Sequence, residues 1–472
     1  MSDRKIYKPK PISGFPEWLP EYRRVEQQWL DHIRRVFESY GYTNIETPAV
    51  EEIDVLTAKG EVDKEIYVLE RLHKEEGDKD ARLALHFDQT VPFARYVAQH
   101  FQHLAFPFKR YQMQKVWRGE RPQLGRMREF YQCDIDVIGI DNLPLHFDAE
   151  MPAVIYECLM GLNIGRVQIR ISNRKIISGF LEANGLTDAE ANKCIIAKFD
   201  KADRYRQNND NIGVFNLVMG DISDSFYSLN PNPEKYGRTA LEPILYSFYQ
   251  VASQTYKSGD DLKTKIEATE HFDLRNEMLS EGIDELCFVA NNLQHLSNNN
   301  GVAAVVIDLG IFRGLDYYTG TVYETRLLDV PDFTSSIVSG GRYDDLAGSY
   351  INKHLPGVGI SIGLSRLFDV LKDKGIVQPS RKSPTDVLVI LPSEDMRAVA
   401  ASTAQTLRAR GLNVELFHKP AKLGDQIKYA ENKNIPFVWI VPFDKNGAHA
   451  VKNLTTREQT DGVNPATWQK PA

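Results

Sequence analysis

The chain has 472 residues, of which 42% are hydrophobic and 26% are charged, and its formal net charge is −7. This composition excludes a disordered or fibrous protein, and the length allows two or three domains with separate cores. The four cysteines are far apart and form no CxxC pair, which argues against a disulfide framework and a thiolate zinc site. No apolar run is long enough to cross a membrane and the N-terminus lacks a signal-peptide core, so a cytoplasmic protein without membrane partners is expected.

The first predicted element is an amphipathic helix, because hydrophobic residues recur at helical spacing over 25–37 and the pattern stops at Gly41. The segment TNIETPAVEEIDVL follows, and Pro48 within it suits an edge or interface strand. Further strands are predicted at residues 82–86, 108–117, 130–138, 302–309, 321–325 and 337–339. Their hairpin-like succession favours a largely antiparallel sheet over a doubly wound one.

The middle of the chain changes to helical periodicity interrupted by polar clusters. This change predicts a mainly helical insertion at 173–300 that divides a catalytic core into 1–172 and 301–376. In the segment SNRKIISGFLEANG, Ser172 is the expected helix cap and Gly185 the expected stop.

A linker rich in proline and serine, VQPSRKSPTD, precedes a last domain predicted at 385–472. The β-α-β-α-β order of its hydrophobic segments predicts a small parallel sheet. The domain has no GxGxxG motif, which argues against a dinucleotide site.

The segment VWRGERPQLGRMREFYQCDIDVIG, residues 116–139, carries four arginines within eleven residues of an acidic chain. Guanidinium groups match the geometry of phosphate and carboxylate oxygens. Gln132, Asp134 and Asp136 follow on one face of a strand, because side chains alternate with a period of two. Taken alone, the arginines favour a solvated or ion-paired face. The alternating acidic residues fit the solvent-exposed face of an amphipathic strand as well as they fit a binding surface.

Other motifs decide between these interpretations. The chain contains LGIFRGLDYYTGTVYE at 309–324, GGRYDDL at 340–346, the later GVGISIGLSRLFDVL, and LHFDQTVPFARY at 85–96. Together they resemble the motifs of histidyl-tRNA synthetase, a class II aminoacyl-tRNA synthetase, and the resemblance covers nearly the whole chain. It implies an α/β fold in which an antiparallel-sheet class II core with a helical insertion is followed by an α/β anticodon-binding domain.

The resemblance also implies substrates, partners and residue roles. The substrates would be L-histidine, ATP and tRNA(His), with Mg²⁺ on the pyrophosphate, and a homodimer would form through the helix near Trp29 and the Pro48 segment. The residues that match the family's histidine-binding positions are Asp88, Thr90, Arg118, Gln132, Asp136, Arg313, Tyr317 and Tyr318. Those that match ATP-binding positions are Arg118, Phe130 and Arg366, and those assigned to the tRNA acceptor end are Arg121, Gln123 and Arg128.

Within this set, Arg118 and Arg313 are the catalytic candidates, because two anions must meet and the site has to supply cations at both reacting groups. Arg313 would lie at the α-phosphate, where other members of the class place a metal ion, so no metal ligand is assigned in the protein. Asp134, taken singly, is interpreted as structural.

The chain departs from the family pattern at several places. Asp88 and Asp136 stand where many bacterial members have glutamate, and Ser365 stands where glutamate is frequent. The chain ends soon after NPATWQKPA, so the family's last helix is expected to be missing or abbreviated.

Two other functions compete with ligation of histidine to tRNA. One is a paralogue that binds histidine or tRNA without catalysis, which the presence of Arg118, Arg313 and Arg366 argues against. The other is a synthetase of the same subclass for glycine, proline or threonine, which RGLDYY and Asp136 argue against.

Overall fold

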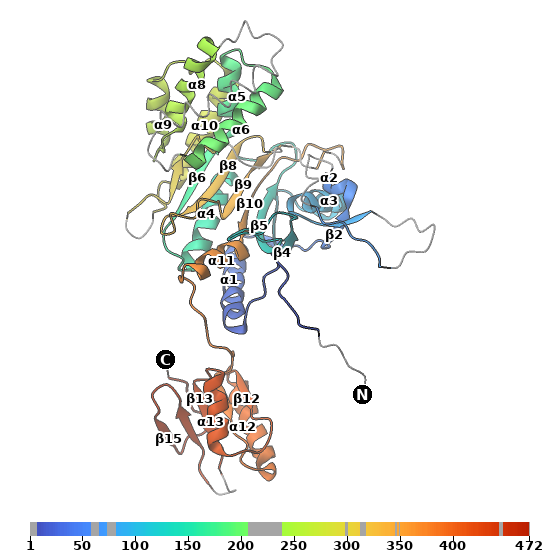
Figure 1. Cartoon of the computed structure of the whole chain (residues 1–472), viewed down its shortest axis with the longest axis vertical. Helices are drawn as coiled ribbons and strands as arrows, with labels where there is room; N and C mark the ends of the chain where they lie inside the picture. Colours follow the sequence, from blue (N-terminus) through green and yellow to red (C-terminus); the bar gives the residue numbers. More distant parts are fainter. Residues whose placement is uncertain are drawn as a thin grey trace. The chain divides into compact units, whose positions relative to one another are not determined.

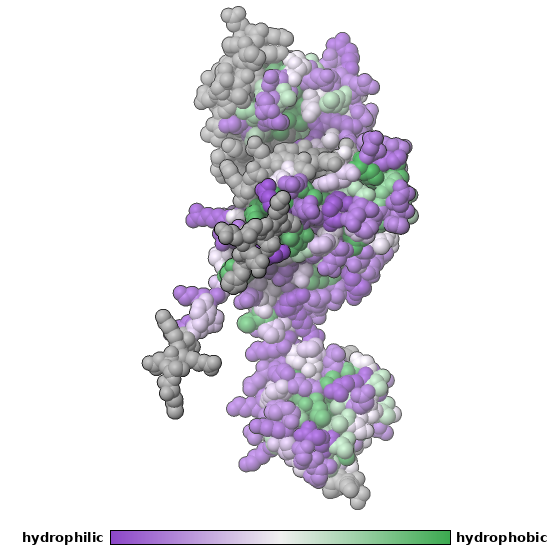
Figure 2. Space-filling view, turned by 90° about the vertical axis from the view of Figure 1, so that its right-hand side faces the viewer, coloured by the Kyte–Doolittle hydropathy of each residue, from purple (hydrophilic) through white to green (hydrophobic). Residues whose placement is uncertain are grey.

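The computed structural model describes residues 7–57, 66–72, 82–205, 238–297, 301–311, 318–344, 347–348, 350–442 and 447–471. The chain divides into two compact units, Met1–Pro16 with Trp29–Val377, and Glu17–Gln28 with Gln378–Ala472 (Figure 1). On the face drawn in Figure 2 the described surface is mostly hydrophilic, and hydrophobic residues form small separate patches. Among the described residues, no helix is both long and apolar enough to span a membrane.

The first unit is built on an eight-stranded sheet with the order β1-β4-β5-β10-β9-β8-β6-β7. In that order the strands are Thr43–Asn44, Phe108–Trp117, Glu129–Ile138, Gly357–Gly363, Val338–Tyr343, Thr321–Leu327, Val167–Asn173 and Val305–Ile307. The pairs from β4 to β6 are antiparallel, whereas the outer pairs β1–β4 and β6–β7 are parallel. The largely antiparallel core is therefore confirmed, but β6 and β10 were not predicted.

A second, two-stranded sheet pairs β2 (Val50–Glu52) with β3 (Leu83–Leu85). Pro48 lies in the irregular stretch between β1, at one edge of the large sheet, and β2. The short helix α2 (Ile53–Thr57) continues directly from β2.

Helices cover one face of the large sheet near its centre: α4 (His146–Gly161), α11 (Leu364–Asp373) and the part of α1 (Pro20–Ser39) that begins at Trp29 (Figure 1). Phe37 of α1 contacts Tyr111 of β4, with ring centroids 5.8 Å apart. Phe368 of α11 contacts Trp29 of α1 at 5.3 Å. This is the hydrophobic face of β5, so the polar residues at alternate positions of β5 point to the opposite face, where α3 (Thr90–His100) lies.

The described residues between β6 and β7 form a helical group that Figure 1 shows gathered beyond β6. It consists of α5 (Arg174–Ala183), α6 (Ala189–Tyr205), α8 (Arg238–Ala252), α9 (Gly259–Glu267) and α10 (Glu277–Leu293). The prediction of a Ser172 cap is wrong, because Ser172 still pairs with Val322 in the β6–β8 ladder. Asn173 is the cap of α5, and its side-chain oxygen accepts the Lys175 amide at 3.0 Å.

The second unit has a five-stranded sheet in the order β12-β11-β13-β14-β15. Its strands in that order are Val414–Leu416, Val387–Val389, Phe437–Ile440, Ala450–Asn453 and Gln459–Asp461, and its helices are α12 (Arg397–Ala409) and α13 (Leu423–Asn432). The pairs β11–β12 and β11–β13 are parallel as predicted, but β14 and β15 pair antiparallel, so a purely parallel sheet was wrong.

The tail of the second unit packs on its core without forming a helix. In the described residues after β15, the chain makes turns up to Pro471. Trp468 from this tail packs against Phe437 and Trp439, with ring centroids 5.4 and 5.6 Å away.

Candidate functional site

Three neighbouring strands bring polar side chains to one face of the large sheet. The strand register aligns three rows across β4, β5 and β10: Arg110–Asp136–Gly359, Gln112–Asp134–Ser361 and Gln114–Gln132–Gly363. Residues two apart along a strand share a face, and directly opposite residues on paired strands share it as well. Gln132, Asp134 and Asp136 thus share a face, as their alternation predicts.

The first row is organised around the carboxylate of Asp136. A Cβ at Gly359 would lie 2.0 Å from Oδ1 of Asp136, so the glycine provides the room that this carboxylate occupies. Asp136 accepts a hydrogen bond from the Tyr343 hydroxyl at 3.1 Å and pairs with Arg110 at 2.5 Å. Arg110 is fully buried, and its guanidinium lies 4.3 Å from the centre of the Phe93 ring of α3.

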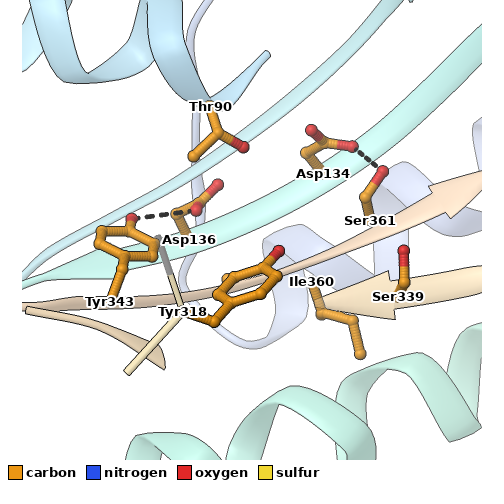
Figure 3. A pocket seen from close by; sticks show the side chains of 9 residues that line it. Thr90, Asp134, Asp136, Tyr318, Ser339, Tyr343, Ile360 and Ser361 are labelled. Atoms are coloured by element: carbon orange, nitrogen blue, oxygen red, sulfur yellow. Dashed lines mark hydrogen bonds between the residues drawn. The ribbon is translucent and has the colours of Figure 1, made fainter. Parts of the chain in front are cut away.

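A small pocket opens over these rows. Its lining residues are Thr90, Asp134, Asp136, Tyr318, Ser339, Tyr343, Gly359, Ile360 and Ser361. Figure 3 shows Asp136 bonded to Tyr343 in one part of the pocket and Asp134 bonded to Ser361 in another, with the Tyr318 ring in the region between them. The pocket is therefore lined by carboxylates and hydroxyls from several elements that are distant in sequence.

Burial raises the pKa of all three carboxyl groups in this region. The pKa of Asp134 rises to about 7, and those of Asp88 and Asp136 rise to about 6, chiefly because burial removes water from the charged form. The positive charge of Arg110 acts in the opposite direction on each of the three. A cationic ligand in the pocket would favour the ionised carboxylates and lower these pKa values.

Two buried acceptor atoms near the pocket have no hydrogen-bond partner among the described residues: Oδ2 of Asp88 and Oε1 of Gln132. The other oxygen of Asp88 accepts the Val91 amide at 3.2 Å, at the start of α3. The amide nitrogen of Gln132 donates to the Ser361 hydroxyl at 2.7 Å. Because an unsatisfied buried acceptor is costly, these atoms mark where a ligand with N–H donors would bind favourably.

A second cluster lies at the other end of β5, around the buried ring of Phe130. The guanidinium of Arg366 lies 4.0 Å from the ring centre and that of Arg118 lies 5.4 Å from it. Arg118 also donates to the Phe87 carbonyl at 3.0 Å, and one carboxylate oxygen of Glu120 lies 3.9 Å from Arg118 and 3.8 Å from Arg366. Two cations beside an aromatic ring can bind the phosphates and the base of a nucleotide.

The loop between β4 and β5 holds the three residues assigned to the tRNA acceptor end. Arg121 and Gln123 are exposed, whereas Arg128 is half-buried and donates from Nε to the Glu120 carbonyl at 3.2 Å. Two other assigned residues, Arg313 and Tyr317, lie outside the described residues. Ser365 accepts the Tyr131 amide at 3.1 Å, so its hydroxyl holds α11 to β5.

Sequence reasoning did not assign Arg110, Tyr343 or Ser361. Tyr343 lies within the quoted GGRYDDL motif, so that motif was the available signal. Arg110 and Ser361 belong to the site only through strand register, which no local pattern reveals.

The antiparallel sheet, with an acidic pocket beside an arginine–phenylalanine cluster and a separate α/β unit, defines a class II aminoacyl-tRNA synthetase. A family model described as histidyl-tRNA synthetase matches residues 14–205 and 237–367, and one described as anticodon binding domain matches 386–463. The chain belongs to the histidyl-tRNA synthetase family, whose members activate histidine with ATP and transfer it to tRNA.

Curated relatives and a solved structure agree with this assignment. A histidine–tRNA ligase of Thermobifida fusca is 48% identical over 99% of this chain and 100% of its own length. One of Micrococcus luteus is 42% identical over 98% of this chain and 96% of its own length. The crystal structure of histidyl-tRNA synthetase from Nostoc sp. PCC 7120 matches with a TM-score of 0.81 and 37% identity, and the match covers 97% of each chain.

Proposed function

We propose that the acidic pocket binds the histidine that this ligase activates. Asp88, Thr90 and Gln132 would hold the α-ammonium group, and Asp136 with Tyr318 would hold the imidazole, with Tyr317 close by. The free acceptors of Asp88 and Gln132 support the first assignment, because an ammonium group supplies the missing donors. A pocket built to hydrogen-bond a polar ring excludes amino acids that lack one, since its own polar groups would stay unpaired.

The cluster around Phe130 is assigned to ATP. Phe130 would pack on the adenine ring, Arg366 would hold the γ-phosphate, and Arg118 would bridge the histidine carboxylate and the α-phosphate. Arg313 is assigned to the α-phosphate, where a guanidinium stabilises the charge that develops as the carboxylate attacks. No protein nucleophile takes part, so catalysis rests on placing two anions together and neutralising them.

Mg²⁺ is assigned to the pyrophosphate part of ATP, where it would neutralise the charge of the leaving group. The described residues contain no group of three His, Cys, Asp or Glu side chains that could hold a metal ion. The acidic pocket suits an N–H donor instead, because two of its carboxylates are already bonded to Arg110, Tyr343 and Ser361.

The remaining assignments concern tRNA and assembly. Arg121, Gln123 and Arg128 would contact the acceptor end of tRNA(His), and the second unit would contact the anticodon. A homodimer is proposed through the helix near Trp29 and the Pro48 segment, and a cytoplasmic location is proposed as well.

The observation that carries the histidine assignment is the row Arg110–Asp136–Gly359, which fixes one carboxylate in the floor of the pocket. The test is ATP–pyrophosphate exchange with Asp136→Asn. Asparagine is preferable to alanine, because its amide oxygen still accepts a hydrogen bond from the buried Arg110, whereas alanine leaves that guanidinium with neither an acceptor nor a counter-charge at this position. The histidine KM should rise by about 10- to 100-fold, as expected for an unpaired polar group in a closed site, with little change in the ATP KM.

Wild-type exchange with glycine, proline and threonine is the matched comparison, and none of these amino acids should support it. A variant that binds ATP and histidine equally poorly would indicate a folding defect and remove the assignment. Exchange with one of the other amino acids would place the chain in a different specificity group.

A further inference from the structure

Asp134 is part of a hydrogen-bond relay that ends at the Gln132 side chain. Ser361 lies directly opposite Asp134 in the β5–β10 register, and Gln132 is two residues before Asp134 on the same face. The Gln132 amide nitrogen donates to the Ser361 hydroxyl oxygen at 2.7 Å, and that hydroxyl donates to Oδ1 of Asp134 (Figure 3). The three side chains form one connected chain from an amide to a carboxylate.

The carboxylate of Asp134 determines which group donates and which accepts in each hydrogen bond of the relay. An ammonium group in the pocket favours the ionised form of Asp134. The ionised carboxylate only accepts hydrogen bonds, so the single proton of the Ser361 hydroxyl then goes to Asp134. The Ser361 oxygen then has only lone pairs left for Gln132, and Gln132 must turn its NH₂ group toward it. The amide oxygen of Gln132 therefore points the other way, and it is the buried acceptor without a partner among the described residues.

The backbone of Gln132 is fixed independently of this relay. Gln89 donates from its side-chain amide to the backbone carbonyls of Gln132 and Gln114, at 3.1 and 2.9 Å. With the backbone held, the side-chain torsions of Gln132 stay free, including the rotation of the terminal amide that exchanges its oxygen and its nitrogen. The relay removes that freedom.

We propose that Asp134 is a positioning residue, which acts through Ser361 to keep the Gln132 amide oxygen directed at the α-ammonium group of histidine. The proposal rests on the assignment of Gln132 to that ammonium group. It gives Asp134 a role in substrate affinity without direct contact, where the sequence indicated a structural residue. Asp134 also lines the pocket, so a direct contact with the ammonium group is the competing explanation.

The first test reverses the relay. In Asp134→Asn the new amide can donate to the Ser361 oxygen, which frees the Ser361 proton for the Gln132 oxygen and turns the Gln132 NH₂ group toward the ammonium group. The histidine KM should rise by roughly 10- to 100-fold, since an attraction is replaced by a repulsion between donors. The kcat should change little, because the ammonium contact is the same in the ground state and the transition state.

The second test removes the middle of the relay without changing any charge. Ser361→Ala should raise the histidine KM to a similar degree, and Ser361→Thr, which keeps the hydroxyl, should restore it to within about threefold. The double variant Asp134→Asn with Ser361→Ala should be no worse than the poorer single variant, because members of one relay are not additive. If Asp134 contacts the substrate directly, Ser361→Ala should leave the KM near wild type, and the proposal fails.

A histidine analogue without the α-amino group, 3-(imidazol-4-yl)propionate, separates positioning from general damage. Its inhibition constant should be the same within about threefold in wild type and in all relay variants, since no ammonium group is present to sense the Gln132 amide. A comparable loss of affinity for this analogue would show that the variants distort the pocket and would overturn the proposal.

Gln132→Ala distinguishes failure of the relay from failure of the underlying assignment. A raised histidine KM in Gln132→Ala, with normal KM values in Ser361→Ala and Asp134→Asn, would reject the relay alone. An unchanged KM in Gln132→Ala would reject the role of Gln132 in binding the ammonium group, and the relay with it.

Discussion

At the scale of single residues, the position of one carboxylate depends on a missing Cβ. Gly359 lies in β10 between β5 and β9, so its backbone cannot shift without loss of pairing on both sides. Asp136 uses the space above it and is held there by Arg110 and Tyr343. Four residues from four different strands therefore determine the space and the charge around the Asp136 carboxylate.

We expect Gly359→Ala to displace the Asp136 carboxylate, because the added methyl group would lie 2.0 Å from Oδ1. The histidine KM should rise by more than about tenfold, and the overpacking should cost about 1–3 kcal/mol. Exchange kinetics and thermal unfolding measure the two effects. Gly424→Ala in α13 is the control, since nothing lies within 4 Å of a Cβ there; equal behaviour of the two variants would contradict the steric argument.

The buried Asp134 should make stability depend on pH. Burial raises its pKa from 3.8 to about 7, so between these values the unfolded chain is ionised while the folded chain keeps the proton. Stability therefore falls as the pH rises through this window, by at most about 1.4 kcal/mol per pH unit, and no further above it. The Tm of Asp134→Asn minus that of wild type should accordingly increase between about pH 5 and about pH 8.

Asp332→Asn is the matched control for this titration, because the Asp332 side chain is 85% exposed. If the Tm of Asp134→Asn minus that of wild type stays constant with pH, the predicted effect of Asp134 on stability is refuted. If both this prediction and the relay hold, Asp134→Asn gains stability at high pH while it loses histidine affinity. A residue retained for substrate affinity at the expense of stability is common in binding sites.

Local patterns could predict only part of the site. The common face of Gln132, Asp134 and Asp136 follows from alternation within one strand, which a local pattern contains. The partners of these residues could not be found in this way, because Ser361 is 227 positions from Asp134 and Tyr343 is 207 positions from Asp136. Strand register, rather than residue type, decides those contacts.

At the scale of elements, the strands that were missed have weak local signals. β10 contains three glycines in the seven residues GVGISIG, and glycine is depleted in strands. β6 carries Arg170 in a buried position, where it donates to Asp308 at 2.6 Å. The partner of Arg170 is distant in sequence, so the sequence around Arg170 shows only a charged residue. That charged residue interrupts the hydrophobic run that would otherwise predict a buried strand.

At the boundary between β6 and α5, the cap of the helix is Asn173 and not the predicted Ser172. Asn173 accepts the Lys175 amide and donates to Glu285 of α10 at 2.7 Å, so Asn173→Ala should lose about 1–2 kcal/mol of stability. Ser172→Ala should cost less, because Ser172 lies within the β6 ladder and makes no capping bond in the described structure. Thermal unfolding of the two variants measures the difference, and a greater loss for Ser172→Ala would restore the original prediction.

At the scale of the whole molecule, the second unit has a core of its own, which includes Val389, Leu407 and Trp439. The predicted linker coincides with the boundary at Val377, because proline, serine and charge cannot supply a core on either side. The hairpin β14–β15 was not foreseen, since its strands are short and largely polar.

A chain that ends at Val377 should therefore keep ATP–pyrophosphate exchange within a few-fold of wild type, and should lose most tRNA charging through lost phosphate and base contacts. Both activities are measured on the same preparation, at several salt concentrations. Binding of tRNA to the full chain should weaken as salt increases. Equal charging by the truncated and full chains would contradict the role given to the second unit.

The pairing of β5 with β10 also sets when the site can form during synthesis. Asp134 and Ser361 are separated by 227 positions, so at about 5–20 residues per second the ribosome needs roughly 10–45 seconds between them. During this interval β5 can pair with β4, its neighbour on one side, but its neighbour on the other side, β10, has not yet been made. Asp134 and Asp136 place charge on that unfinished strand, and charge on an unpaired strand opposes pairing with other nascent chains.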